Sequence, residues 1–368
     1  MLSSEAMLIG MPEVEIDTPA LVIELDTMEV NIAKMQAYFS GRKSNLRPHF
    51  KTHKCVNLAH KQLAAGALGL TCAKVEEAEV LVNGGIFKNI LIANEVVTKH
   101  KIAKLMGLNK QAEVMVCVDN PANVADLSDA AQMFGVEVGV FVEVNVGMNR
   151  CGVNTTEEAL DLAKQVSKVK GLRFTGLQGY EGHVVHIMDL EERKAVVKKD
   201  LQKLLDTREA VEKAGIEVKL VDSGGTGSYN ITGAIPGIDE IQAGSYLFGD
   251  VSYLRVMKDF KPSLKLLTTV ISRPSRDRLI TDMGLKAAST DQTLPEPISV
   301  RGIKVNKLAE EHCYMDVDNP SRELKIGDKI ELIPGHVCTT VNLHDRYYGV
   351  RGGRVEAVWE ISARGKFR

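Results

Sequence analysis

The sequence predicts an α/β fold, a TIM-type (β/α)8 barrel followed by a C-terminal antiparallel β domain. Short apolar runs alternate with helical patterns between residues 45 and 245. Eight such runs occur, and eight is the strand number that closes this kind of barrel. After about residue 255 the alternation gives way to short β-type runs separated by turns. An open, doubly wound sheet is the alternative, but no GxGxxG motif follows the first strand.

The barrel elements follow one another in a regular order. The strands are expected at residues 45–51, 68–72, 89–93, 113–118, 136–144, 172–178, 217–221 and 240–243. Between them, apolar residues at spacings of three and four predict helices over residues 54–65, 74–82, 98–108, 121–134, 156–168 and 191–214. Acidic residues at the start of the last two helices suit the positive end of the helix dipole.

The flanking regions have a β pattern. Thr18–Asp26 predicts a strand before a helix over residues 28–39, and this strand could join the β domain or cap the barrel. The later strands are expected at residues 264–272, 278–281, 298–303, 311–316, 329–333, 337–342, 347–351 and 355–361. We therefore assign residues 20–255 to the barrel, and residues 256–368 together with residues 1–19 to the β domain.

Length and composition exclude several classes of protein. The 368 residues carry a formal net charge of −2, which argues against a nucleic-acid or membrane-surface binder because both need a basic excess. No stretch approaches the roughly 20 apolar residues of a membrane helix. Residues 1–10 contain no Lys or Arg and do not resemble a signal peptide. Six cysteines without a CxxC pair indicate a reducing, cytoplasmic environment.

Lys51 is the first candidate for chemistry, because it follows the first barrel strand. Catalytic groups of such barrels lie at the carboxyl ends of the strands. Burial by His49, Phe50 and His53 would lower the pKa of the ammonium group and make a nucleophilic amine. A solvated surface lysine is the alternative.

A glycine-rich loop follows the seventh strand. Gly224, Gly225 and Gly227 stand among the hydroxyl residues Ser223, Thr226 and Ser228, so that backbone N–H groups can approach an anion closely. Barrels often bind phosphate with the loops after strands seven and eight, and Gln242–Tyr246 could complete the site. The alternative is a tight turn without a ligand.

Two further loops carry polar groups at the same end. Arg150, on a glycine-flanked loop after the fifth strand, can hold a phenolate or carboxylate with its rigid donor fork, or form an ordinary salt bridge. Tyr180, His183 and His186 cluster after the sixth strand and are candidates for acid–base work.

His336 and Cys338 form a candidate metal pair. On a strand, residues i and i+2 point to the same face, so both could bind one ion. Two protein ligands leave open positions for water and substrate, as a catalytic metal requires. Cysteine favours zinc over magnesium or manganese. An accidental His-x-Cys pair is the alternative.

Taken together, these segments resemble the fold-type III pyridoxal-phosphate enzymes, which share the alanine racemase barrel. The resemblance is closest to the D-threonine aldolase and D-serine dehydratase branch and covers nearly the whole chain. The segments that carry it are TPALVIELD, RPHFKTHK, TCAKVEEAEV, GMNRCGV, LQGYEGH, DSGGTGS, QAGSYLF, PGHVCTTVNLHD and VRGGRVEAVW.

The resemblance implies a role for each candidate. Lys51 would form a Schiff base with pyridoxal phosphate, Arg150 would contact the phenolic oxygen, and His336 and Cys338 would bind a divalent ion, Zn or Mn/Mg. A histidine matching His186 lies near the metal-bound water in these enzymes. The remaining residues implied at the cofactor are Tyr180, which is also a catalytic candidate, Ser223, Gly224, Gly225, Thr226, Gly227, Ser228 and Gln242.

The implied activity is a pyridoxal-phosphate- and metal-dependent lyase of the D-threonine aldolase type, acting on D-β-hydroxy amino acids. The His336/Cys338 pair resembles the dehydratases instead, because the aldolases typically have His-x-Asp. A D-serine or D-3-hydroxyaspartate dehydratase therefore stays open, and a racemase or pyridoxal-phosphate carrier ranks behind it. A phosphate-sugar barrel enzyme that does not use pyridoxal phosphate is the alternative outside this family. The family also implies a small-molecule D-amino acid substrate, no nucleic-acid or membrane partner, and a homodimer.

Overall fold

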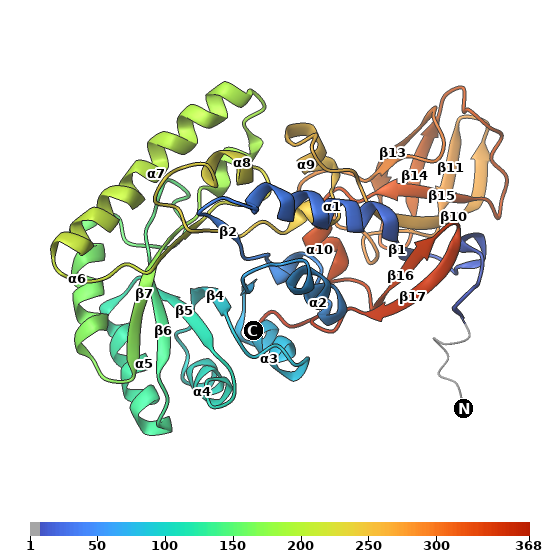
Figure 1. Cartoon of the computed structure of the whole chain (residues 1–368). Helices are drawn as coiled ribbons and strands as arrows, with labels where there is room; N and C mark the ends of the chain where they lie inside the picture. The colour runs from blue at the N-terminus through green and yellow to red at the C-terminus, as the bar shows by residue number, and fades with distance from the viewer. Residues whose placement is uncertain (1–7) are drawn as a thin grey trace. The chain divides into compact units, whose positions relative to one another are not determined.

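The computed structural model describes residues 8–368, and at His186 it describes the backbone alone. Residues 1–7, which belong to the segment without a signal-peptide pattern, lie outside the described residues. The chain divides into two compact units (Figure 1). The barrel unit comprises residues 35–51, 58–244 and 366–368, and the β unit comprises residues 1–34, 52–57 and 245–365. The β unit thus takes more of the N-terminal region than the 19 residues expected for it.

The barrel unit contains eight parallel strands in the order β2-β9-β8-β7-β6-β5-β4-β3. A parallel bridge between His49 and Thr71 joins the segment after β2 to β3, which closes the barrel. The strands are β2 (Asn45–Leu46), β3 (Leu70–Cys72), β4 (Ile90–Glu95), β5 (Val114–Val118), β6 (Val138–Glu143), β7 (Leu172–Gly179), β8 (Leu220–Ser223) and β9 (Glu240–Ile241). The predicted barrel is therefore confirmed.

Helices connect these strands, as Figure 1 shows for α3 to α7. They are α2 (Val56–Ala64), α3 (Val75–Asn83), α4 (Lys99–Leu108), α5 (Pro121–Phe134), α6 (Thr156–Lys168), α7 (Leu190–Lys213) and the short α8 (Tyr229–Thr232). Two begin and end at the predicted residues because local signals set their ends. Asn120 caps α5 before Pro121, and Thr155 and Glu158 form a capping box at α6.

The β unit contains a sheet in the order β13-β14-β11-β10-β1-β16-β17, with β15 and β12 paired beside β10. Its strands are β1 (Ala20–Glu24), β10 (Leu264–Ser275), β11 (Arg278–Thr281), β12 (Glu296–Pro297), β13 (Ile303–Leu308), β14 (Cys313–Val317), β15 (Lys329–Ile333), β16 (Arg346–Arg351) and β17 (Arg354–Glu360). All pairs are antiparallel except β1 with β16, so this sheet is mixed. The N-terminal strand, left open above, joins the β sheet and leads into α1 (Leu25–Phe39).

Two strand predictions in the β unit are wrong. Residues 337–342, expected as a strand, form the helix α10 (Val337–Val341), where Asp250 Oδ2 accepts a hydrogen bond from Val337 N and so satisfies one of the backbone donors at the helix start. The strand expected over residues 298–303 instead begins at Ile303, because Gly302 adopts a positive φ of 77° in a turn within that run.

Among residues 8–368, no helix has the length and apolar character needed to cross a membrane.

Candidate active site

Lys51 lies just beyond β2 at the carboxyl end of the barrel. It is part of the 3₁₀ turn η3 (Phe50–Thr52) and is partly buried. The backbone leading to it is held on both sides, since His49 N donates to Ala243 O at 3.2 Å and Thr71 N donates to Pro48 O at 2.9 Å. Lys51 therefore lies at the end of a barrel strand, as predicted.

The glycine-rich loop is organised by Glu181, a residue that sequence reasoning missed. This carboxylate is fully buried after β7. Its Oε2 accepts a hydrogen bond from Gly224 N at 3.1 Å and lies 3.0 Å from Ser223 Oγ, a hydroxyl that also lies 2.6 Å from Gly179 O. Its Oε1 accepts from Ser228 Oγ at 2.7 Å and from Thr232 Oγ1 at 2.5 Å. Polar groups of the loop and of α8 thus surround the buried carboxylate, and both serine hydroxyls are engaged within the protein.

Tyr180 brings Arg150 and the glycine-rich loop together. The Arg150 guanidinium carbon lies 5.9 Å from the centroid of the Tyr180 ring. A Cβ added at Gly225 would lie 3.3 Å from the same ring, and one at Gly227 would lie 2.7 Å from Val185. A larger residue at either position would therefore crowd these neighbours.

The turn that carries Arg150 is held from within. Asn145 Oδ1 accepts hydrogen bonds from Gly147 N and Asn149 N, both at 3.0 Å. Gly147 has a φ of 114°, which only glycine adopts readily. His183, the other histidine of the predicted cluster, pairs with Asp200 at 2.8 Å. The side chain of His186, a predicted catalytic group, lies outside the described residues.

An acidic cluster that the sequence did not reveal adjoins this turn. One oxygen or sulfur atom from each of Glu95, Asp119 and Cys151 lies within 4.8 Å of the others. Burial, followed by the neighbouring Glu95, raises the pKa of Glu143 to about 9. The same two causes raise the pKa of the Cys151 thiol to about 11. Glu143 is therefore protonated near neutral pH.

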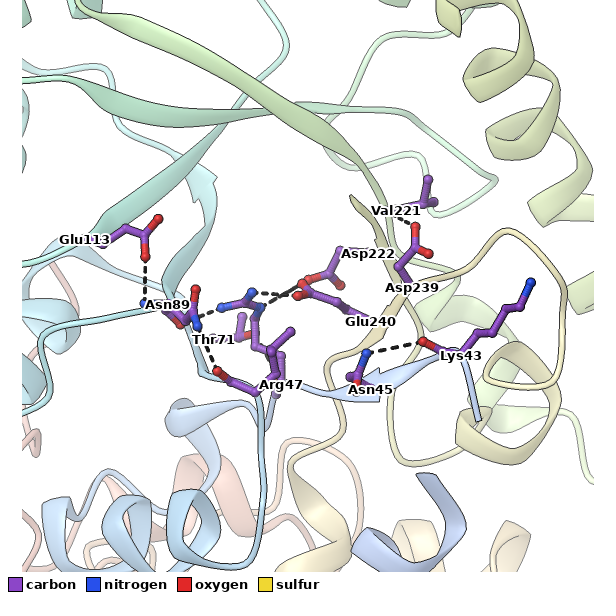
Figure 2. Close-up of polar contacts among 11 residues, drawn as sticks. Lys43, Asn45, Arg47, Thr71, Asn89, Glu113, Val221, Asp222, Asp239 and Glu240 are labelled. Carbon is purple, nitrogen blue, oxygen red and sulfur yellow. Dashed lines mark hydrogen bonds and ion pairs between the residues drawn. The ribbon is translucent and has the colours of Figure 1, made fainter. Parts of the chain in front are cut away.

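A buried ion cluster lies inside the barrel (Figure 2). Arg47 forms a bidentate ion pair with Glu240. Its Nε donates to Glu240 Oε2 at 2.8 Å, and its Nη2 donates to Glu240 Oε1 at 2.7 Å. Asp222 lies 4.0 Å from Arg47, and burial followed by the charge of Glu240 raises its pKa well above the ordinary value. The charge of Arg47 and a side-chain contact with Gln242 lower that pKa in part.

His336 and Cys338 meet in the β unit, although not on a strand. Burial lowers the pKa of His336, but its contacts with Cys338 and Asp291 outweigh that effect and raise it to about 9. The Cys338 sulfur also lies 3.6 Å from Thr52 Oγ1. The helical turn brings the pair together in place of the expected alternation of a strand. An imidazole and a thiol in contact suit a divalent ion such as zinc.

Comparisons with known proteins identify relatives of this chain. Residues 23–252 match the family model "Alanine racemase, N-terminal domain", and residues 263–350 match "Putative serine dehydratase domain". The chain is 40% identical to 3-hydroxy-D-aspartate aldolase of Paracoccus denitrificans, over 97% of this chain and 94% of the relative. It is also 40% identical to D-threonine aldolase of an Arthrobacter species, over 97% and 95% of the two chains.

Solved structures agree with these relatives. D-Threonine aldolase from Filomicrobium marinum superposes with a TM-score of 0.95 at 38% identity, covering 98% of this chain and 99% of that one. A metal-free cysteine-to-alanine mutant of D-threo-3-hydroxyaspartate dehydratase superposes with a TM-score of 0.84 at 25% identity, covering 95% and 98%. With its barrel and its β sheet both matched, the chain belongs to the alanine racemase N-terminal domain family, in the fold-type III group whose members at about 40% identity are aldolases.

Proposed function

We propose that this chain is a pyridoxal-phosphate- and divalent-metal-dependent lyase that cleaves D-β-hydroxy amino acids to glycine and an aldehyde, as D-threonine aldolases do. The observation that carries the proposal is the 40% identity to two aldolases over 97% of the chain. The partly buried Lys51 at the barrel mouth supports it, because this chemistry needs an amine there.

The residues of the barrel unit fit pyridoxal phosphate. Bound there, the cofactor would supply an electron sink for negative charge at the substrate Cα. Lys51 would hold it covalently, Arg150 would bind its phenolic oxygen, and the backbone of Gly224–Gly227, with Thr226, would face its phosphate. The donor set carries this fit, because it offers an amine at Lys51, a cation at Arg150 and, at Gly225 and Gly227, backbone where a Cβ would crowd Tyr180 and Val185.

Glu181 changes the roles expected for two serines. Because the Ser223 hydroxyl contacts Gly179 O and Glu181, and the Ser228 hydroxyl donates to Glu181, we assign both to holding the loop in shape. Phosphate binding then rests on backbone N–H groups of the loop. Tyr180 and His186 stay catalytic candidates for moving a proton, and Gln242 stays a candidate for contacting the cofactor.

His336 and Cys338 would hold a divalent ion, zinc before manganese or magnesium, in the β unit. Such an ion would supply Lewis acidity at the substrate hydroxyl. The metal-free dehydratase mutant supports the assignment, because a cysteine was replaced in that structure. We further propose a homodimer in the cytoplasm, with residues 20–255 as the cofactor-binding barrel and residues 256–368, together with residues 1–19, as the β domain that carries the metal site.

A dehydratase, which eliminates water from the substrate and then takes up water to release ammonia and a keto acid, is the second candidate, and Cys338 is the observation that favours it. The aldolases typically carry aspartate at this position, whereas the dehydratases carry cysteine. A racemase or a cofactor carrier ranks third, because neither needs the His336/Cys338 pair.

Product analysis tests the proposal. The purified protein is incubated with D-threonine, pyridoxal phosphate and either Zn²⁺ or Mn²⁺. Glycine and acetaldehyde would establish the aldolase, whereas 2-oxobutanoate and ammonia would establish the dehydratase. Lys51→Ala should abolish both turnover and the visible absorbance of the lysine-bound cofactor, and the exposed Lys88→Ala is the matched control. A colourless wild-type protein after cofactor addition would refute the assignment.

A further inference from the structure

Asp291 lies beside the proposed metal pair and has no role in the function proposed above. It belongs to the loop between β11 and β12, within the β unit. Its Oδ2 lies 2.7 Å from His336 Nδ1. We propose that Asp291 is the positioning residue of the metal site, which orients His336 and fixes the imidazole in the form that binds metal. This inference rests on the metal site of the proposed function.

The hydrogen bond determines which ring nitrogen is left for a metal. An ionised carboxylate can only accept hydrogen bonds, so Nδ1 of His336 must carry the proton and donate it to Asp291. In the neutral ring the lone pair is then on Nε2, so Nε2 is the ring atom left for a metal, whose binding displaces the second proton of the imidazolium. A carboxylate behind a metal-binding histidine also raises the basicity of the ring.

The second oxygen of the Asp291 carboxylate, Oδ1, holds the group in place. Asp291 Oδ1 accepts hydrogen bonds from Ser289 Oγ at 2.6 Å and from Thr339 Oγ1 at 2.8 Å. Thr339 lies on α10, one residue after Cys338. With Oδ1 held by two hydroxyls, Oδ2 is directed at the ring. Both oxygens are thus engaged within the protein, which assigns Asp291 to positioning His336 and not to ligating the metal.

The loop is also tied to the helix that carries Cys338. Ser289 N donates to Oγ1 of Thr340, which is fully buried on α10, at 3.1 Å. His344 Nε2 lies 2.7 Å from Ala287 O. The segment from Ala287 to Asp291 and the helix α10 therefore form one rigid support, and Asp291 stays in register with both proposed ligands. Zinc affinity should depend on it.

Zinc binding by the full-length protein loaded with pyridoxal phosphate tests the inference. The zinc affinity is measured by competition with a chromogenic chelator, and the Co²⁺-substituted protein reports thiolate ligation by its charge-transfer absorbance. Asp291→Ala should weaken zinc binding by about 10–100-fold and leave the cobalt–thiolate band in place at saturating Co²⁺. Asp291→Asn, which keeps an acceptor oxygen, should lose less zinc affinity than Asp291→Ala. The exposed Asp318→Ala in the same unit is the control and should bind zinc like the wild type.

The outcomes separate this inference from the metal site itself. If His336→Ala and Cys338→Ala lose zinc but Asp291→Ala binds it as the wild type does, the positioning role is overturned and the metal site stands. If neither His336→Ala nor Cys338→Ala affects zinc binding, the metal site falls too. A loss in Asp291→Asn as large as in His336→Ala would make Asp291 a ligand and also overturn the proposal. If Asp291→Ala fails to fold, Asp291→Asn decides, because wild-type zinc affinity there refutes the role.

Discussion

Replacing Arg47 by methionine should strongly destabilise the barrel unit. Arg47, Glu240 and Asp222 are all fully buried, and the guanidinium donates two hydrogen bonds to Glu240 and a third to Asn89 O. Arg47→Met fills most of the same volume but leaves the Glu240 carboxylate in the interior without its cation. Removing one partner of a buried pair costs about 3–5 kcal/mol of unfolding free energy, so we expect a loss of that size.

Urea unfolding followed by far-UV circular dichroism measures this change. The double variant Arg47→Met/Glu240→Gln removes the stranded charge as well, and should recover most of the loss. Lys213→Met, which breaks the exposed pair with Glu209, is the control and should change the unfolding free energy by less than about 1 kcal/mol. If the unfolding free energy of Arg47→Met lies within about 1 kcal/mol of the wild-type value, the buried pair does not stabilise the barrel as reasoned.

Three further predictions concern other parts of the chain. Glu181→Ala removes the acceptor of Gly224 N and Ser228 Oγ in the glycine-rich loop and of Thr232 Oγ1 on α8; it should weaken pyridoxal-phosphate binding and increase hydrogen exchange over residues 223–228, and an unchanged loop would contradict the role given to Glu181. Glu143 has a folded-state pKa of about 9 against an ordinary 4.5, so the folded protein keeps a proton that the unfolded chain releases, and wild-type stability should fall as pH rises through that window. In Glu143→Gln, the urea midpoint should change less with pH between pH 6 and 9 than it does in the wild type. If the midpoints of the two proteins change with pH in parallel, the result would count against a raised pKa of Glu143. Thr155→Ala should cost about 1 kcal/mol in urea unfolding by removing the cap of α6, and no change would show that the cap is dispensable.

Much of the barrel could be predicted because its signals are local. The central strands β5 and β6 are buried along their whole length, and such strands are continuous apolar runs that stand out in the sequence. The ends of α5 and α6 follow from caps within a few residues of each end. The positions of Lys51 and the glycine-rich loop at strand ends followed from the same alternation.

The turn around His336 shows where local reasoning stopped. Val337–Asn342 is rich in β-branched residues and was expected to be a strand, yet Asp250, 87 residues earlier, binds the amide of Val337 at the start of α10. The two candidate ligands meet in either conformation. Only the structure placed Asp291 behind His336, from a loop 45 residues away.

The sequence by itself determined the alternation of strands and helices, the division into a barrel and a β region, and the residues from which a cofactor site could be built. These depend on periodicity, caps and turns, which act over a few residues. The tertiary structure alone decided the parallel pairing of β1 with β16, the burial of Arg47 with Glu240, and the engagement of the loop serines by Glu181. Each of these unites segments far apart in the chain, and a buried charge finds its partner only when folding removes the water that would otherwise solvate it.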